Sequence, residues 1–190
     1  LKKKKFITAS IHREENVDSK KGLRSMIDSY NFLIKEFKLP VIVSTHPRTR
    51  NRLEKENLLN LADKKIIWHK PFGLIDFINL QLNSFCVVSD SGTIHEDSSI
   101  LNFPAVAIRK STEKAESIDA GHCIITGLKK ENVLNAVKIA TSDFSSQSKS
   151  KIPNGYEVKN VASKIGRIII GMNDVVRNKI WGEKNKFFID

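Results

Sequence analysis

Residues 85–101 contain the most informative stretch of this chain, Ser89-Asp90-Ser91-Gly92-Thr93-Ile94-His95-Glu96-Asp97. The apolar run Phe85-Cys86-Val87-Val88 precedes it and the half-apolar segment 98–101 follows it. A short apolar run that ends in Ser, Gly and Thr and leads into a helical segment predicts a strand, a tight turn and a helix N-terminus. Such a turn directs backbone N–H groups and the positive end of a helix dipole at one point, which favours a phosphate group.

The side chains of this turn suit a nucleotide. Ser91 and Thr93 offer hydroxyl donors, and Gly92 lets the backbone come close to an anion. Glu96 or Asp97, about one helical turn later, could accept a hydrogen bond from a ribose hydroxyl. Because Ser and Thr are also common helix N-caps, a purely structural cap is the alternative interpretation.

The composition excludes several classes of protein. With 190 residues, 40% of them apolar and 28% charged, the chain is long and apolar enough for one globular domain. The net charge of +11 favours polyanionic partners, but Lys and Arg are spread along the whole chain, so a general lysine bias explains the charge equally well. No apolar stretch approaches the roughly 20 residues that span a bilayer, and the N-terminal apolar segment is too short for a signal peptide.

The two cysteines indicate the compartment. Cys86 and Cys123 each lie in an apolar run, without metal-ligand spacing or a disulfide framework, so we expect core thiols in a reducing, cytoplasmic environment. The chain begins with Leu and reaches a predicted strand almost at once. We therefore expect it to be a segment of a longer protein, with no membrane partner.

Strand and helix signals alternate along the chain. Strands are predicted at 6–10, 40–45, 65–68, 85–89, 105–108 and 123–125, and helices at 22–37, 52–62, 74–82, 93–101 and 130–141. Short strands that are apolar throughout are typical of a parallel sheet buried on both faces, so we expect an α/β fold with helices on both faces. The predicted domain comprises residues 1–142, followed by a Ser/Lys/Pro/Gly linker (143–155), a long helix (156–181) and an unassigned tail (182–190).

Polar segments follow five of the predicted strands. They are residues 12–16, 46–50, 71–77, 89–97 and 109–114. In parallel α/β sheets ligands bind at the carboxyl ends of the strands, so these segments predict a single site on one edge. Several of these residues have two interpretations. His12 either binds ligand or is merely solvated, and His46 either contacts ligand or packs its loop. Glu15 either orients Arg13 or His12 or makes a surface ion pair, whereas Arg109 and Lys114 either bind an anion or belong to a solvated loop.

The remaining histidines have no predicted role in the site. His95 is expected to face solvent on its helix, and the sequence suggests no partner for His69 or His122. The five histidines lack the spacing of metal ligands.

Taken together, the polar segments resemble the C-terminal half of the non-hydrolysing UDP-N-acetylglucosamine 2-epimerases. The matching pieces, in the family's order, are residues 8–16, 44–49, Pro71 with Phe77, 89–97, and 104–109 with 112–116. The His-Pro-Arg-Thr loop at 46–49 and the ending at 156–181 look closest to the branch that forms UDP-N-acetyl-L-fucosamine for surface polysaccharides.

The resemblance implies a fold and a reaction. The fold is of the glycosyltransferase-B type, two Rossmann-like domains facing a cleft, with this chain as the second domain and the intact protein as a homodimer. In the family's reaction UDP leaves the anomeric carbon as the C2 proton is lost, and UDP is re-added with C2 inverted. No metal or redox cofactor is required. The carboxylates that move the C2 proton belong to the first domain, so we expect this chain alone to bind UDP weakly and to epimerise nothing.

The resemblance also assigns roles to individual residues. It places the catalytic His12 beside the phosphates, Ser91, Gly92 and Thr93 on the diphosphate, Asp97 on the ribose, Phe77 and the backbone near Phe72 on the uracil, and Lys114 in an anion clamp. Arg13, Glu15, His46, Glu96 and Arg109 complete the expected substrate-binding set.

Three positions depart from the family's pattern, which often has Gly at 93, Glu at 97 and Arg at 114. Lys114 therefore lacks the bidentate phosphate contact that Arg makes. Two other functions remain: the donor-binding domain of a glycosyltransferase-B enzyme, and a basic nucleic-acid-binding domain.

Overall fold

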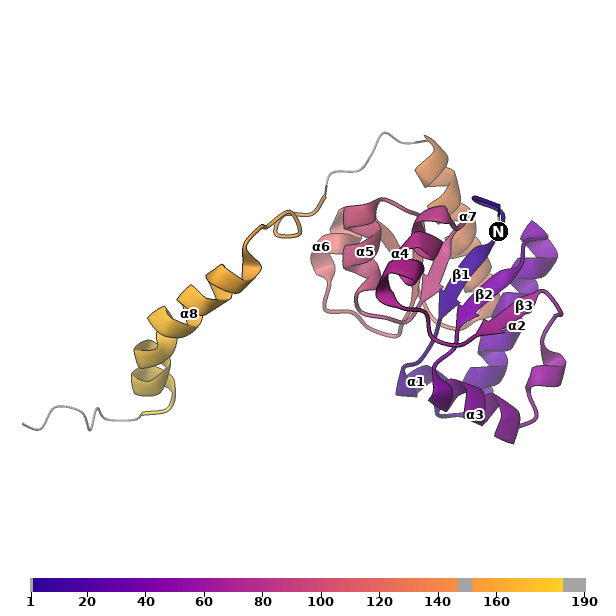
Figure 1. The fold of residues 1–190 in the computed structure, drawn as a ribbon, viewed down its shortest axis with the longest axis horizontal. Helices are drawn as coiled ribbons and strands as arrows, with labels where there is room; N and C mark the ends of the chain where they lie inside the picture. Colours follow the sequence, from indigo (N-terminus) through magenta and orange to yellow (C-terminus); the bar gives the residue numbers. More distant parts are fainter. Residues whose placement is uncertain (1, 147–151, 183–190) are drawn as a thin grey trace, which may run out of the picture. The chain divides into compact units, whose positions relative to one another are not determined.

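The computed structural model describes residues 2–146 and 152–182. Its centre is a six-stranded sheet in the order β3-β2-β1-β4-β5-β6 (Figure 1). The strands are β1 (Ile7–Ser10), β2 (Val41–Ser44), β3 (Ile66–His69), β4 (Val87–Ser89), β5 (Ala105–Ile108) and β6 (Cys123–Thr126), and every neighbouring pair is parallel. The predicted parallel α/β sheet is therefore confirmed. The strand order reverses between β1 and β4, and this is the position where α/β sheets bind ligands.

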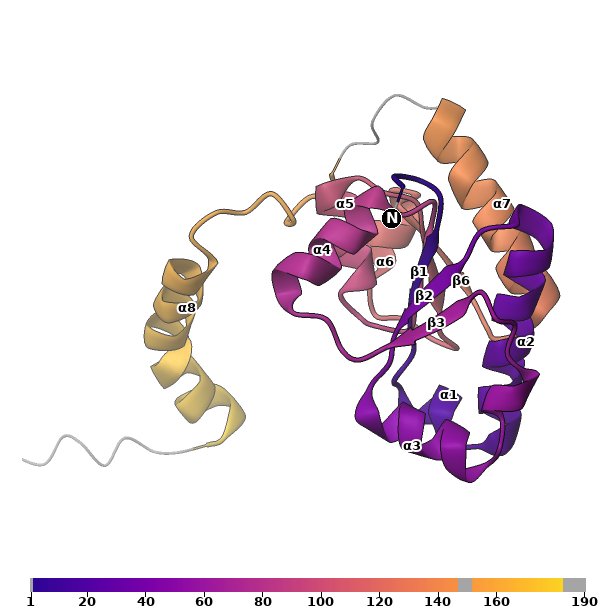
Figure 2. The ribbon, with the colours of Figure 1, turned by 45° about the vertical axis from the view of Figure 1, so that its right-hand side comes forward.

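Helices cover both faces of the sheet. They are α1 (Glu14–Val17), α2 (Lys20–Phe37), α3 (Pro47–Lys55), α4 (Leu74–Asn83), α5 (Ile94–Leu101), α6 (Ala115–Asp119) and α7 (Lys130–Ser146). Figure 2 shows α2 and α7 on one face and α4, α5 and α6 on the other. The short helices α1 and α3 lie beyond the carboxyl ends of the first two strands (Figure 2).

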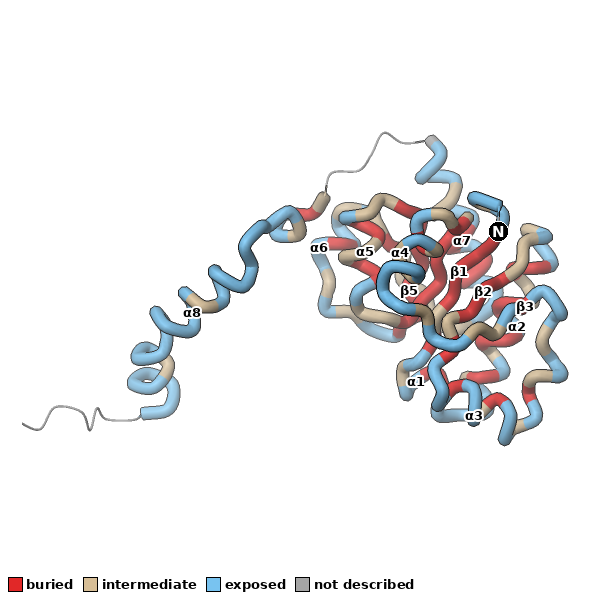
Figure 3. The backbone as a smooth tube through the Cα atoms, in the orientation of Figure 1, coloured by how far each residue is buried: buried red, intermediate tan, exposed pale blue. Residues whose placement is uncertain are grey.

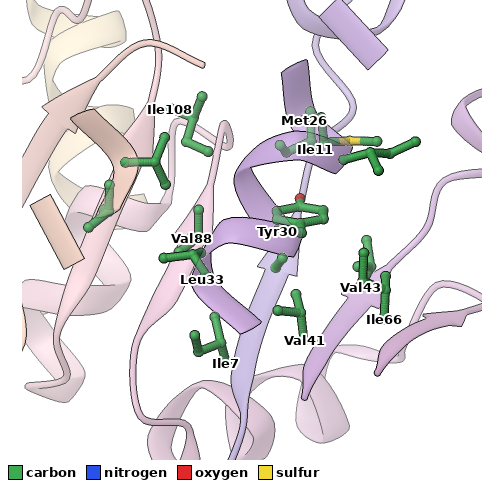
Figure 4. Packing of buried hydrophobic residues seen from close by; sticks show 14 of the residues in the cluster. Ile7, Ile11, Met26, Tyr30, Leu33, Val41, Val43, Ile66, Val88 and Ile108 are labelled. Atoms are coloured by element: carbon green, nitrogen blue, oxygen red, sulfur yellow. The ribbon is translucent and has the colours of Figure 1, made fainter. Parts of the chain in front are cut away.

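The core has one cluster on each face of the sheet. Strand residues such as Ile7, Val41 and Val88 pack with Tyr30 and Leu33 of α2 (Figure 4). The other face contributes a smaller cluster: Val87, Ile94, Phe103, Ala105, Ala107 and Cys123. Because side chains alternate along a strand and both faces are covered, the four inner strands β2, β1, β4 and β5 are buried along most of their length (Figure 3). The edge strands β3 and β6 have one buried residue each. The two cysteines are buried thiols in this core, as predicted.

Several predicted boundaries were wrong. Helix α3 begins at Pro47, in the segment predicted to be a loop, and ends at Lys55, before a separate 3-10 turn at Leu59–Leu61. Proline is well suited to the first turn of a helix, where its missing N–H costs nothing. The predicted loop 109–121 contains α6, and the loop after β1 contains α1; both helices are too short for a periodic pattern to reveal them.

Helix α7 continues to Ser146, five residues past its predicted end at Thr141. The Ser and Thr residues here suggested a linker, but the Thr141 hydroxyl donates to the Val137 carbonyl (2.8 Å) and the Ser145 hydroxyl to the Ser142 carbonyl (2.7 Å). These back-bonds let hydroxyl side chains remain in a helix. Residues 147–151 of the predicted linker and residues 183–190 of the tail lie outside the described residues.

The chain divides into two compact units, Leu1–Tyr156 and Glu157–Asp190. The second unit contains α8 (Val161–Val175), which continues as a π-helical turn over Val176–Ile180. The predicted long helix thus begins five residues later than expected. Ile165, Ile168, Ile169 and Met172 follow the spacing of one helical face.

Within the described part of the chain, no helix has both the length and the apolar character required to cross a bilayer.

Candidate functional site

Asp90 organises the carboxyl end of the sheet. It directly follows β4, and its side chain is fully buried. Its carboxylate accepts hydrogen bonds from the backbone N–H of His12 (3.1 Å to each oxygen), the backbone N–H of Arg13 (2.9 Å) and Nδ2 of Asn16 (3.0 Å). Asn16 also donates to the Ile108 carbonyl at 3.2 Å. One buried carboxylate therefore fixes the loop after β1 against the ends of β4 and β5.

Sequence reasoning missed Asp90 and Asn16 as members of this network, although both lie in the matched segments. The available signal was an acidic residue directly after an apolar strand, where a buried charge requires several donors. The backbone N–H groups of His12 and Arg13 donate to the Asp90 carboxylate, and Glu15 is exposed on α1. Among the described residues, Glu15 makes no hydrogen bond or ion pair with either side chain, and its place in the substrate-binding set stays a prediction.

His12 and Arg13 face the turn after β4. The His12 side chain is half exposed, and its Nδ1 lies 3.3 Å from Asp90 Oδ1. Arg13 Nε donates to the Asp90 main-chain carbonyl at 2.8 Å. Both side chains therefore contact the same residue, Asp90, at the end of β4.

The turn at 89–93 carries a chain of hydroxyl groups. Ser10 Oγ and Ser89 Oγ lie 2.7 Å apart, the backbone N–H of Ser91 donates to Ser89 Oγ (3.0 Å), and Ser91 Oγ lies 3.0 Å from Thr93 Oγ1. Thr93 occupies the N-cap position of α5, yet within the described residues its hydroxyl makes no capping hydrogen bond. The structural-cap interpretation is thus not supported for Thr93, and the positive end of α5 opens toward the turn.

Two guanidinium groups flank Gly92. A Cβ atom at Gly92 would lie 3.7 Å from Nη2 of Arg13 and 3.7 Å from Nη1 of Arg109. Arg109 is only 5% exposed, so it does not belong to a solvated loop. Its Nη2 pairs with Glu113 at 3.1 Å, but among the described residues its Nε and Nη1 have no hydrogen-bond partner. A buried guanidinium with unpaired N–H groups beside a helix N-terminus has the chemistry of an anion site.

Lys114 and Glu96 form an ion pair between the start of α6 and α5. The hydrogen bond to Glu96 raises the pKa of Lys114. The pair places both predicted residues at the edge of the site, but with the ammonium directed to the carboxylate. Lys114 thus neutralises Glu96 here, and would have to exchange this partner to contact a phosphate.

A comparison of the chain with known protein families identifies the family of this chain. Residues 1–170 match the model of the family described as UDP-N-acetylglucosamine 2-epimerase. The chain belongs to this family.

Individual members of the epimerase family are similar over most of the chain. The UDP-N-acetylglucosamine 2-epimerase of Methanocaldococcus jannaschii is 34% identical over 136 residues, which cover 70% of this chain and 37% of that protein. The chain is also similar to the solved structure of the Rickettsia bellii UDP-N-acetylglucosamine 2-epimerase, with 38% sequence identity and a TM-score of 0.78. The matched region covers 96% of this chain and 48% of the R. bellii chain.

A solved structure of the M. jannaschii UDP-GlcNAc 2-epimerase in complex with UDP-GlcNAc and UDP matches this chain with 30% sequence identity and a TM-score of 0.77. The matched region covers 87% of this chain and 45% of the M. jannaschii chain. The chain spans less than half the length of each of these epimerases. These neighbours support the predicted Rossmann-like unit of a glycosyltransferase-B type fold.

Asp97 and Phe77, which the epimerase resemblance assigns to ribose and uracil, lie on the neighbouring helices α5 and α4. Asp97 of α5 is half buried and accepts a hydrogen bond from Gln81 Nε2 of α4 at 3.2 Å. Burial raises the pKa of the Asp97 carboxyl. Phe77 lies one helical turn before Gln81, so it shares the face of α4 that approaches Asp97.

Phe72 and His69 stack after β3. Their ring centroids are 4.0 Å apart with an interplanar angle of 4°, so His69 does have a partner. The two rings lie between the end of β3 and Gly73, the residue before α4. The expected uracil contact near Phe72 was to the backbone, and the stack leaves that prediction open.

His46 serves as the N-cap of α3. Its Nδ1 accepts a hydrogen bond from the backbone N–H of Arg48 at 3.2 Å. Arg48 in turn pairs with Glu14 (2.9 Å) and Asp18 (2.8 Å), which joins α3 to α1. His46 thus caps its own helix at the same end of the sheet as His12, and a contact of His46 with ligand stays a prediction.

The prediction that His95 faces solvent was wrong. His95 is fully buried, with Nδ1 3.2 Å from Ser117 Oγ and Nε2 3.5 Å from Thr112 Oγ1. Burial and, next, the charge of Arg109 lower the pKa of His95. The reason for the error is α6, which covers this side of α5 and which the sequence pattern did not reveal.

Proposed function

We propose that this chain is the UDP-binding domain of a UDP-N-acetylhexosamine 2-epimerase, and that the diphosphate binds over Gly92. The observation that carries the proposal is the buried Arg109 guanidinium, whose Nη1 and Nε have no partner among the described residues. Its Nη1 and the Nη2 of Arg13 lie at equal distances from the position that a Cβ of Gly92 would take. A diphosphate at this position would supply the acceptors that these donors lack.

The proposed reaction eliminates UDP from C1 of the sugar as the C2 proton is removed, and then re-adds UDP with C2 inverted. Negative charge grows on the diphosphate as the C1–O bond breaks. Donors that bind the leaving diphosphate more strongly than the intact substrate lower the barrier. Arg13, Arg109 and the N–H groups at the start of α5 would act in this way. His12, the proposed catalytic side chain, would contact the phosphates from the loop after β1.

The other proposed contacts follow from the site. Asp97 would accept from the ribose, Phe77 and the backbone near Phe72 would hold the uracil, and Ser91 and Thr93 would donate to the phosphates. The intact cytoplasmic enzyme would close this domain against an N-terminal domain and act as a homodimer. We propose that this chain alone binds UDP weakly and does not epimerise. Formation of the fucosamine derivative stays a prediction.

Thermal unfolding of the purified chain tests the proposal. UDP at a hundredfold excess over its Kd should stabilise the fold by about 2.7 kcal/mol, or roughly 5–10 °C for a chain of this size. A single-stranded oligonucleotide at matched phosphate concentration should give no comparable increase. Stabilisation by the oligonucleotide but not by UDP would instead support a nucleic-acid-binding domain.

Isotope exchange distinguishes the epimerase from a glycosyltransferase. A longer protein that contains this domain should introduce deuterium from D₂O at C2 of UDP-N-acetylglucosamine during turnover. Transfer of the sugar to an acceptor without exchange at C2 would contradict the proposed reaction.

A further inference from the structure

We propose that Asp90 is a positioning residue that holds His12 as the Nδ1–H tautomer and so makes Nε2 the ring nitrogen available to a bound diphosphate. The inference deepens the proposed function, on which its role in catalysis rests. It assigns a role to a buried acidic residue that does not itself touch substrate.

The first step is the rigidity of the carboxylate. Asp90 is fully buried at the end of β4, and its two oxygens receive the N–H groups of His12, Arg13 and Asn16 at 2.9–3.1 Å. Two of those donors belong to the backbone of the loop that carries the imidazole. Because the carboxylate and the loop hold each other, Asp90 cannot turn away from the His12 ring without losing several buried hydrogen bonds.

The second step is the choice of tautomer. His12 Nδ1 lies 3.3 Å from Asp90 Oδ1. A lone pair on Nδ1 would face a negatively charged oxygen at this distance, whereas a proton on Nδ1 would be attracted to it. The neutral imidazole therefore carries its proton on Nδ1.

The third step is the freedom of Nε2. Among the described residues Nε2 makes no hydrogen bond, Asp90 contacts the ring at Nδ1, and the His12 side chain is 49% exposed. Nε2 is thus the nitrogen that can accept a proton or, once protonated, donate to an anion. This arrangement matches other carboxylate–histidine pairs, in which the carboxylate fixes the ring and its tautomer.

The same residue also orients Arg13. The main-chain carbonyl of Asp90 accepts from Arg13 Nε at 2.8 Å, which holds the guanidinium with Nη2 toward Gly92. A change of the Asp90 side chain leaves this carbonyl in place. Side-chain substitution therefore separates the effect on His12 from the main-chain contact with Arg13.

The test is ¹⁵N NMR of the histidine ring nitrogens in the chain without UDP, with the His12 signals assigned from His12→Gln. The wild-type chain should show Nδ1–H as the main neutral tautomer of His12. Asp90→Asn should shift the population toward Nε2–H, because the amide can donate to an unprotonated Nδ1. A dominant Nε2–H tautomer in the wild-type chain would overturn the proposal, and this measurement needs no variant of Asp90 to fold.

Asn16→Ser is the matched control. It removes a hydrogen bond to the same carboxylate without changing the group that faces His12. We expect it to lower the free energy of unfolding and to keep the Nδ1–H tautomer. Equal tautomer shifts in Asp90→Asn and Asn16→Ser would show that Asp90 has only a structural role.

Addition of UDP then separates the two proposals. UDP should change the Nε2 signal of His12 more than its Nδ1 signal. If the tautomer is as expected but UDP changes no signal at His12, Arg13 or Gly92, the proposed nucleotide site fails while the Asp90–His12 relationship stands. If UDP binds at Gly92 and Nδ1 is the nitrogen that responds, the positioning role fails instead.

Discussion

Arg109 and Glu113 form an ion pair whose two members have very different environments. Arg109 Nη2 and Glu113 Oε2 are 3.1 Å apart, but the Arg109 side chain is 3% exposed and that of Glu113 is 65% exposed. The buried Arg109 side chain is confined by packing, whereas the exposed Glu113 side chain can rotate out of the ion pair into solvent. If the diphosphate binds this guanidinium as proposed, the exposed Glu113 carboxylate competes with it.

Substitution at these two positions should have opposite effects. Arg109→Lys keeps the charge but loses the forked N–H donors of the guanidinium. UDP affinity should therefore fall by more than about tenfold, which is the effect of losing one hydrogen bond to a charged group. Glu113→Gln removes a negative charge beside the diphosphate and should raise UDP affinity about two- to fivefold, in the range of an exposed ion pair. Isothermal titration calorimetry measures both. Weaker binding by Glu113→Gln would show that Glu113 supports the site rather than competing in it.

Asp97→Asn should improve stability while weakening binding. Burial raises the pKa of Asp97 in the folded chain above the value of about 3.9 in the unfolded chain, so its ionised form opposes folding at neutral pH. The variant should unfold at a higher temperature than the wild type at pH 7, and this advantage should vanish near pH 3, where both states are protonated. Loss of a charged acceptor for the ribose should weaken UDP binding by roughly five- to a hundredfold.

His95 should make the stability of the fold depend on pH. Its pKa is lowered in the folded chain and is about 6.5 when unfolded, so the unfolded state binds the extra proton first on acidification. The stabilising contribution is complete above pH 6.5 and is lost as the pH falls toward the folded-state value, with a slope of at most about 1.4 kcal/mol per pH unit. Urea unfolding between pH 7.5 and 5 should show a smaller loss in His95→Gln than in the wild type. Identical pH profiles would contradict the buried neutral imidazole.

Ser91→Ala tests the hydroxyls of the turn. Ser91 Oγ contacts Thr93 Oγ1 beside Gly92, in a half-buried position. Loss of one hydrogen bond to the diphosphate should lower UDP affinity about three- to tenfold, with little change in the free energy of unfolding. Ser145→Ala, on α7, is the control and should leave UDP affinity unchanged. An equal loss in both variants would exclude a specific contact by Ser91.

The sequence predicted the parts of this fold that depend on long apolar patterns. The strands and α2 contain enough buried residues for their periodicity to be read, and the polar segments after the strands had to meet at one edge because parallel strands share a direction. The short helices α1 and α6 have no such pattern. Missing α6 led directly to the wrong environment for His95.

The role of Asp90 could not be predicted for a different reason. A carboxylate after a strand is common, and its role is decided by donors that lie more than seventy residues away in the sequence, on His12, Arg13 and Asn16. Likewise, the sequence places Arg109 in a charged segment, where only the three-dimensional packing reveals that its guanidinium is buried. Long-range hydrogen bonds and the burial of single polar groups are properties of the assembled fold.

The most direct test of the nucleotide site is a crystal structure of this chain with UDP bound. We predict diphosphate oxygens within hydrogen-bond distance of Arg109 Nη1 and of backbone N–H groups at 92–94, with the ribose near Asp97. A structure in which UDP binds elsewhere, with Gly92 and Arg109 Nη1 making no contact to it, would contradict the proposed nucleotide site.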